Sequence, residues 1–248
     1  MPGYTLSEQY SLQLPRQFVL RPSYIQRYWR IEKNNRRQDW SSTTAHFDPA
    51  EVEREAAEEF FARHYKNQRV ERYTTETETP FIYIPLQSQL LKKRSFQLVS
   101  PIEMIRQTAK HDPNRRIIAT AHPSEVYSES ERLALNELCK EDPRIEFRLA
   151  PMHEMLAKCD YVVTQNSSVA FHGLLHKKPA VLFAVCDFHH PHQSALDVGI
   201  EQAFRQVLTH QPDYEGYLHW YLTRHAIFQK DDDVAEQVLR RLHALGLR

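Results

Sequence analysis

From residue 81 onward, short apolar runs alternate with segments whose apolar residues recur at helical spacing. The runs predict strands at residues 81–86, 116–123, 144–149, 161–164 and 180–184. Helices are predicted at residues 100–111, 128–141 and 151–159, and over the segment that carries Val169, Leu174 and Leu175. Such alternation is typical of βαβ units with right-handed crossovers. We therefore predict an α/β fold with one Rossmann-like parallel sheet of about five strands.

The two ends of the chain have a different pattern. Residues 1–48 mix arginines with aromatic residues at weak periodicity, which predicts an irregular or helical arm. An acid-rich helix follows from Asp48-Pro49, and residues 214–228 and 232–247 have helical spacing, the last with an apolar stripe expected to pack as core. We divide the chain into an N-terminal arm and helix, residues 1–75, and a Rossmann-like domain with C-terminal helices, residues 76–248.

Composition and charge narrow the classes of partner and the cellular location that the sequence predicts. The 32 basic and 32 acidic residues cancel, so no net field favours nucleic acid or an anionic membrane as a partner, although basic residues among aromatics in the arm could also bind single-stranded nucleic acid. No apolar run approaches the length of a transmembrane segment, and no secretion signal is visible. Cys139, Cys159 and Cys186 lack metal-type spacing and are expected to be reduced, although a catalytic thiol is conceivable. These features predict a cytoplasmic protein, which could work at the inner face of the membrane.

Polar residues follow three of the predicted strands. They are Gln87 after the first strand, His122, Pro123 and Ser124 after the second, and Gln165, Asn166, Ser167 and Ser168 after the fourth. The carboxyl ends of parallel strands meet at one edge of the sheet, where open α/β folds bind ligands. Serines at a helix start commonly serve only as caps. Together, however, these residues predict an anion site. With only 5 glycines and neither G-x-G-x-x-G nor a P-loop, dinucleotide and P-loop chemistry are not expected.

The loop after the last strand holds Asp187 and the cluster His189–His192. These residue types can bind zinc or another divalent ion, but their spacing fits no standard motif, so we predict no metal site. A metal-dependent hydrolase stays the lowest-ranked alternative. A second alternative is that one of these histidines contacts a ligand.

The pairing of Ala121-His122-Pro123 with Asn166-Ser167-Ser168, together with the strand and turn IYIPLQSQ and the helix SSVAFHGLLHKKPAVLF, resembles the capsule polysaccharide biosynthesis family, which includes bacterial Kdo transferases. The resemblance covers roughly residues 80–230. It implies the C-terminal, nucleotide-sugar-binding half of a GT-B glycosyltransferase. It also implies a CMP-activated acidic sugar, Kdo or sialic-acid-like, as the donor, with no other cofactor. His122 would then contact the phosphate or ribose, and Ser167 and Ser168 the phosphate.

The chain departs from this family at two points. His172 stands where the family has a Glu that would suit a ribose or cytidine contact. Residues 1–75 are too short for the N-terminal Rossmann domain that usually binds the acceptor, so catalytic residues are not assigned. The first hypothesis is a transferase that passes the sugar to a glycan acceptor, with a partner chain or a second copy completing the cleft. The second hypothesis is a non-catalytic nucleotide-sugar-binding or regulatory subunit.

Overall fold

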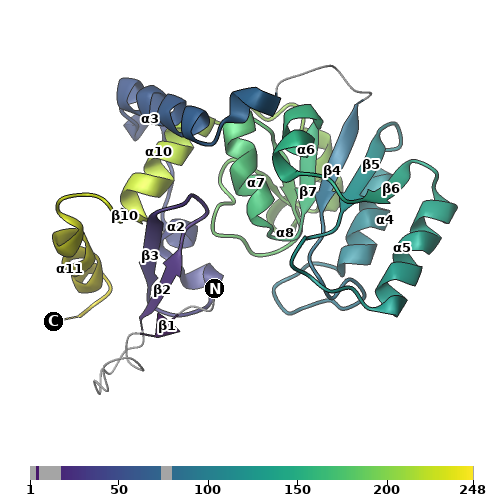
Figure 1. The fold of residues 1–248 in the computed structure, drawn as a ribbon, viewed down its shortest axis with the longest axis horizontal. Coiled ribbons are helices and arrows are strands. Elements are labelled where there is room, and N and C mark those ends of the chain that lie inside the picture. Colours follow the sequence, from purple (N-terminus) through teal and green to yellow (C-terminus); the bar gives the residue numbers. More distant parts are fainter. Residues whose placement is uncertain (1–3, 6–17, 74–79, 248) are drawn as a thin grey trace.

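The computed structural model describes residues 4–5, 18–73 and 80–247 and contains one parallel and one antiparallel sheet (Figure 1). The parallel sheet consists of β4 (Phe81–Pro85), β5 (Arg116–Thr120), β6 (Ile145–Arg148), β7 (Tyr161–Thr164), β8 (Ala180–Leu182) and β9 (Gln193–Ser194). Its strand order is β6-β5-β4-β7-β8-β9, the order of a doubly wound Rossmann sheet. The predicted fold class is therefore confirmed. The sixth strand, β9, was missed because it has only two residues.

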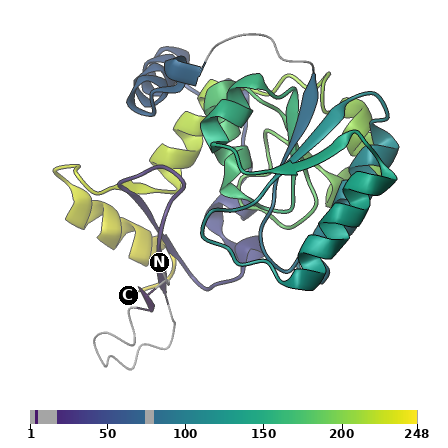
Figure 2. The ribbon, with the colours of Figure 1, turned by 45° about the vertical axis from the view of Figure 1, so that its right-hand side comes forward.

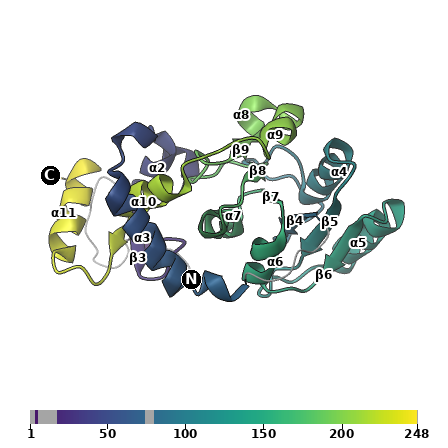
Figure 3. The same ribbon diagram turned by 90° about the horizontal axis from the view of Figure 1, so that it is seen from above.

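Helices cover both faces of the parallel sheet. Figure 3 shows α4 (Pro101–His111) and α5 (Glu129–Glu141) on one face of the sheet, here called the outer face. The opposite, inner face is covered by α6 (Met152–Lys158) and α7 (Ser168–Gly173). The chain runs on from α7 through η4 (Leu174–His176), and β9 is followed by α8 (Ala195–Val198) and α9 (Ile200–Gln206). The predicted serine caps of α4 and α5 are present.

The alternation of side chains along β4 explains its uninterrupted apolar sequence. Phe81 and Tyr83 belong to the hydrophobic core on the side of α6 and α7, whereas Ile82 and Ile84 belong to the core on the side of α4 and α5. Successive strand residues point to opposite faces, so a strand covered on both sides is apolar throughout. The central strand is thereby fixed in position, and the residues that follow it are fixed with it.

The antiparallel sheet joins the two ends of the chain. It pairs β1 (Tyr4–Thr5), β2 (Val19–Pro22) and β3 (Tyr28–Glu32) with β10 (Ile227–Phe228). The remaining elements here are η1 (Arg37–Asp39), α2 (Ser41–Thr44), η2 (Pro49–Glu51), α3 (Arg54–Asn67), η3 (Val70–Tyr73), α10 (Tyr214–Arg224) and α11 (Val234–Ala244). We call residues 18–73 and 214–247 the terminal lobe, which stands beside the parallel sheet in Figure 2. The expected irregular or helical arm is thus partly a sheet.

A small core holds the terminal lobe together. The apolar stripe of α11 packs on Phe18, Ile31 and Ile227, as its pattern predicted. Helix α3 lies along α10, and α10 in turn packs against the segment after α7. The proposed division of the chain at residue 75 stays a prediction. The contacts nevertheless show that the C-terminal helices pack with the N-terminal segment.

Candidate functional site

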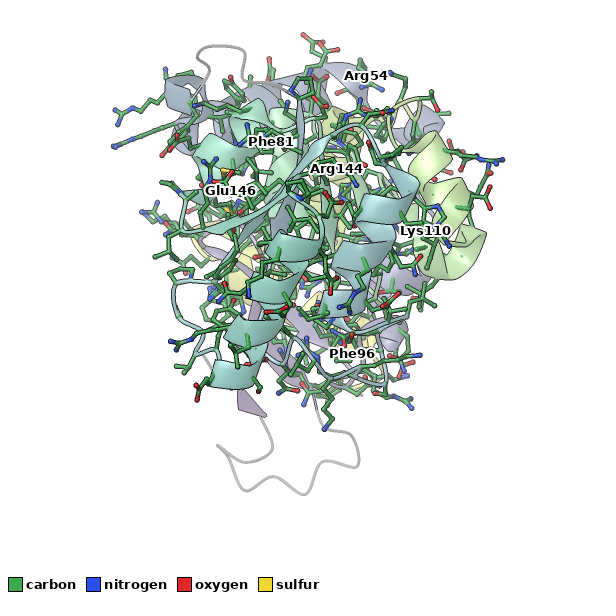
Figure 4. The ribbon with its side chains drawn as sticks, turned by 90° about the vertical axis from the view of Figure 1, so that its right-hand side faces the viewer. Arg54, Phe81, Phe96, Lys110, Arg144 and Glu146 are labelled. Atoms are coloured by element: carbon green, nitrogen blue, oxygen red, sulfur yellow. The ribbon has the colours of Figure 1, made fainter. Side chains whose placement is uncertain are left out.

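A cleft of about 550 Å³ opens at the carboxyl edge of the parallel sheet. In Figure 4, Phe81, which begins β4, lies in the upper half of the view, and Phe96, from the loop that follows this strand, lies near the bottom. Described residues that line the cleft are Tyr83, Pro85, Leu86, Thr120, Ala121, His122, Pro123, Leu149, Ala150, Pro151, Met152, Ser167, Ser168 and Val169. They belong to the last part of β4 and β5 or to the segments that follow β4, β5, β6 and β7. The strand order reverses between β4 and β7, and doubly wound sheets bind ligands at this point.

The His-Pro turn after β5 forms one side of the cleft. The His122 backbone N–H donates to the Tyr127 hydroxyl at 2.9 Å, and the Ser124 backbone N–H donates to His122 Nδ1 at 3.2 Å. Because Nδ1 accepts this bond, the neutral imidazole carries its proton on Nε2. His122 therefore offers an N–H donor from an exposed ring in a turn whose backbone is held on both sides.

The serine turn after β7 also lines the cleft. Ser167 Oγ accepts the Val169 N–H at 3.4 Å, and the Ser167 carbonyl accepts the Ala170 N–H at 3.2 Å. The Ser167 N–H itself donates to Thr164 Oγ1 at 3.3 Å. The turn thus uses several backbone donors that could otherwise bind an anion. Ser168, which is exposed, also lines the cleft.

The remaining walls of the cleft are largely apolar. Pro151, Met152 and Val169 line it, and Leu149 is 78% exposed at its rim. At its floor, Thr120 Oγ1 donates to the Tyr83 hydroxyl at 3.2 Å, and burial raises the pKa of Tyr83 to about 12. A neutral floor with an apolar wall beside polar turns suits a flat base attached to a charged group.

Five predicted residues lie outside the cleft lining, namely Gln87, Ser124, Gln165, Asn166 and His172. Gln165 Nε2 donates to the Val99 carbonyl at 3.1 Å, and Asn166 Nδ2 donates to the Val185 carbonyl at 3.4 Å. These two amides therefore hold neighbouring backbone segments together. Gln87 is also absent from the lining, and its Oε1 is buried without a hydrogen-bond partner among the described residues.

His172 does not line the cleft either and instead belongs to a group of three histidines. Its ring lies 5.7 Å from that of His153, and His153 Nδ1 is 3.2 Å from His176 Nε2. Burial, followed by the nearby His153, lowers the pKa of His172 to about 4. Ser168, one helical turn earlier, is the residue of this helix face that reaches the cleft. At neutral pH His172 is an uncharged, packed side chain.

Asp187, in the loop after β8, forms hydrogen bonds with residues of the terminal lobe. Asp187 is fully buried, and it accepts hydrogen bonds from Arg30 and from the hydroxyls of Tyr221 and Tyr24, the latter two at 2.6 Å. Burial would raise the pKa of Asp187, but Arg30 and Arg37 beside it hold the pKa below its usual value.

The histidines of this loop have structural surroundings as well. His190 Nε2 lies 2.9 Å from the Ala45 carbonyl, and burial lowers the pKa of His192 to about 3. Within residues 18–73 and 80–247, no group of three or more metal-ligating side chains is placed to hold an ion. Burial also raises the pKa of Cys159 to about 12, which leaves it a poor nucleophile.

One residue that the sequence analysis missed supports the cleft from behind the His-Pro turn without lining it. Tyr127 was not singled out, yet its hydroxyl binds both the His122 N–H and the Leu86 carbonyl, the latter at 3.3 Å. A tyrosine shortly after a His-Pro turn was the only available signal. A larger cavity of about 680 Å³ lies in the terminal lobe between α3, α10 and β10, and none of the predicted residues lines it.

The sheet order and the cleft at its switch point define a Rossmann-like domain of the kind that forms half of a GT-B glycosyltransferase. The sequence profile of the capsule polysaccharide biosynthesis protein family matches residues 44–191, and the chain belongs to this family.

One solved structure with a TM-score above 0.5 supports this fold. A KpsC β-Kdo 2,7 transferase structure from Thermosulfurimonas dismutans is similar with a TM-score of 0.57 at 15% sequence identity, over 98% of this chain and 83% of that one. The β-Kdo 2,4 transferase of KpsC from the same organism gives a TM-score of 0.47 at 10% identity, over 86% and 81% of the two chains. None of the curated proteins compared matches the chain. Across the described residues, no helix has the length and apolar character needed to span a membrane.

Proposed function

We propose that this protein binds a CMP-activated acidic sugar in the cleft and transfers the sugar to a glycan acceptor during capsule or surface polysaccharide synthesis. The observation that supports this most is the meeting of the His122-Pro123 turn and the Ser167-Ser168 turn in one cleft at the switch point of the sheet. The family match adds the context of capsule synthesis.

The chemistry of the cleft suits a nucleoside monophosphate. The Nε2–H of His122 and the hydroxyl of Ser168 would donate to phosphate oxygens, and the apolar wall near Met152 would hold the base. As the bond between sugar and phosphate breaks, negative charge grows on the leaving CMP. Donors already held in position stabilise that charge without reorganising.

Calorimetric titration of the protein with CMP, UMP and GDP tests the binding step. We expect CMP to bind most tightly and His122→Ala to weaken CMP binding by about tenfold, the loss of one strong hydrogen bond to a charged group. His243→Ala is the matched control, because His243 is exposed on α11, away from the cleft. Absence of binding by all three nucleotides, or equal CMP affinity in His122→Ala, would refute the assignment.

The composition of the cleft supports the second hypothesis, a non-catalytic nucleotide-sugar-binding or regulatory subunit. None of the described residues that line the cleft carries a carboxylate, the group that commonly serves as the base in sugar transfer. A carboxylate from a partner chain or a second copy would complete the site. Release of CMP from a CMP-sugar in the presence of acceptor measures transfer directly. CMP binding without such release, at every protein concentration, would favour the non-catalytic role.

A further inference from the structure

Three arginines of the terminal lobe surround one tryptophan close to the carboxyl edge of the parallel sheet. The guanidinium carbons of Arg21, Arg30 and Arg37 lie 5.7, 4.4 and 5.6 Å from the ring centroid of Trp40. Trp40 is itself only 2% exposed. Contacts between guanidinium groups and an aromatic face hold the cations in defined positions. The side chains are therefore ordered by the fold.

Only one of these three arginines has a hydrogen-bonded carboxylate. Arg30 binds Asp187, whereas Nη1 of Arg37 lies 4.0 Å from Asp187, beyond hydrogen-bond distance. Arg21 donates to the neutral amide oxygen of Asn35 at 2.7 Å. Among the described residues, the charges of Arg21 and Arg37 thus have no hydrogen-bonded countercharge of their own.

Arg94, from the loop after β4, is a third arginine with no hydrogen-bonded carboxylate among the described residues. Its guanidinium carbon lies 4.9 Å from the Phe96 ring, and the Phe96 carbonyl accepts the Val185 N–H at 2.9 Å, just before Asp187 in the chain. Burial lowers the pKa of Arg94, nearby Glu125 opposes this, and Arg37 lowers it further. Arg94 is therefore in electrostatic reach both of Arg37 and of the turn that follows β5. We call Arg21, Arg37 and Arg94 the arginine cluster.

Each member of the arginine cluster has an unused donor. Arg21 Nε, Arg37 Nη1 and Arg94 Nε are buried and have no hydrogen-bond partner within the described part of the chain. Burial lowers the pKa of Arg21, and the charges of Arg37 and Arg30 lower it further. Unsatisfied buried donors and gathered like charges both cost stability. Unsatisfied donors and gathered like charges of this kind are typical of functional sites, where a bound ligand satisfies the donors and neutralises the charge.

We propose that the arginine cluster binds the carboxylate of an acidic sugar whose other end lies in the cleft. This inference rests on the proposed function, because it assigns the sugar end of the same substrate. Guanidinium groups match a carboxylate in shape and charge and can bind it through paired hydrogen bonds. The amides of Gln165 and Asn166 hold the backbone at Val99 and Val185, the two segments that flank this site.

The test compares Kdo with its neutral methyl ester, both titrated into the full chain in the presence of saturating CMP. We expect the ester to bind at least about tenfold more weakly than the acid. Arg37→Gln and Arg94→Gln should each weaken binding of the acid by about tenfold and leave binding of the ester unchanged. Lys92→Gln is the matched control, since it removes an exposed charge two residues before Arg94. Circular dichroism verifies that each variant is folded.

Equal binding of acid and ester by the wild-type chain would overturn the inference, and this comparison needs no variant to fold. Failure of both ligands to bind, or unchanged acid binding in both arginine variants, would overturn it too. Displacement of Kdo by inorganic phosphate at similar concentrations would mark a general phosphate site and reject the carboxylate assignment. If CMP itself does not bind, the proposed function fails. Discrimination of acid from ester measured without CMP would then still support the cluster.

Discussion

Among single residues, Asp187 is the carboxylate on which the contact between the lobes depends. It is fully buried and neutralises Arg30, which is 2% exposed. We predict that Asp187→Asn lowers the free energy of unfolding by about 3–5 kcal/mol, because it leaves a buried guanidinium without a countercharge. Urea denaturation measures the loss, with the exposed Asp197→Asn as control. A loss no greater than that of the control would contradict this reading of the network.

Which turns form the cleft was predictable, because these turns follow the strands of the parallel sheet. His122 and Ser168 could be placed because parallel strands end at one edge of the sheet. The direction of a side chain within a turn has no such signal. Gln165 lies in the same turn as Ser168 but binds the Val99 carbonyl on the other side. Tyr127 was missed because its role depends on contacts with His122 and with the chain after β4, which become neighbours only in the folded sheet.

At the scale of elements, the start of α5 shows the clearest local determinant. Ser128 and Glu131 form a capping box in which each side chain accepts the backbone N–H of the other residue. Ser128→Ala should lower the free energy of unfolding by about 1 kcal/mol, the usual cost of losing such a cap. Thermal and urea denaturation measure the change. Ser95→Ala, at an exposed serine outside any helix, should change stability much less, and an equal effect would argue against the cap.

The elements that the sequence did not predict are those whose stability comes from distant partners. The helices α4 and α5 carry their caps and apolar stripes within a few residues, so a local pattern is sufficient. Strand β10 has two residues and pairs with β3, about 200 positions earlier in the sequence. Its sequence continues the helical spacing of α10, and only the pairing with β3 makes it a strand. Short strands with long-range partners are outside the reach of periodicity.

At the scale of the whole molecule, the terminal lobe and the parallel sheet form one packed structure. Aromatic side chains of α10, including Tyr217 and Tyr221, join the core that covers the inner face of the sheet near Phe171. The Asp187 network crosses the same boundary. The Asp187 network could not be inferred from a chain divided at residue 75, because it brings Tyr24 and Arg30 together with Asp187. This packing places the arginine cluster beside the sheet edge.

Buried histidines distributed over both lobes should make the molecule sensitive to acid. Burial is the first cause in each case, and it lowers the pKa to about 4 for His172, His176 and His190 and to about 3 for His192 and His225. In the unfolded chain these groups protonate near their ordinary pKa of about 6.5. Their contribution to stability is therefore complete above that pH and is lost as the pH falls toward the folded-state values. We predict a steady loss of unfolding free energy from about pH 6.5 to about pH 4.

The contribution of His172 to this pH dependence of the unfolding free energy can be measured separately. A group whose pKa falls from 6.5 to about 4 on folding contributes about 2 kcal/mol to the change in stability between about pH 7 and about pH 5. His172→Gln should remove that share, so its unfolding free energy should depend less on pH than that of the wild type. Urea denaturation at the two pH values measures both proteins, and the exposed His243→Gln should keep the wild-type dependence. If His172→Gln also kept it, protonation of His172 would not be a source of the acid sensitivity.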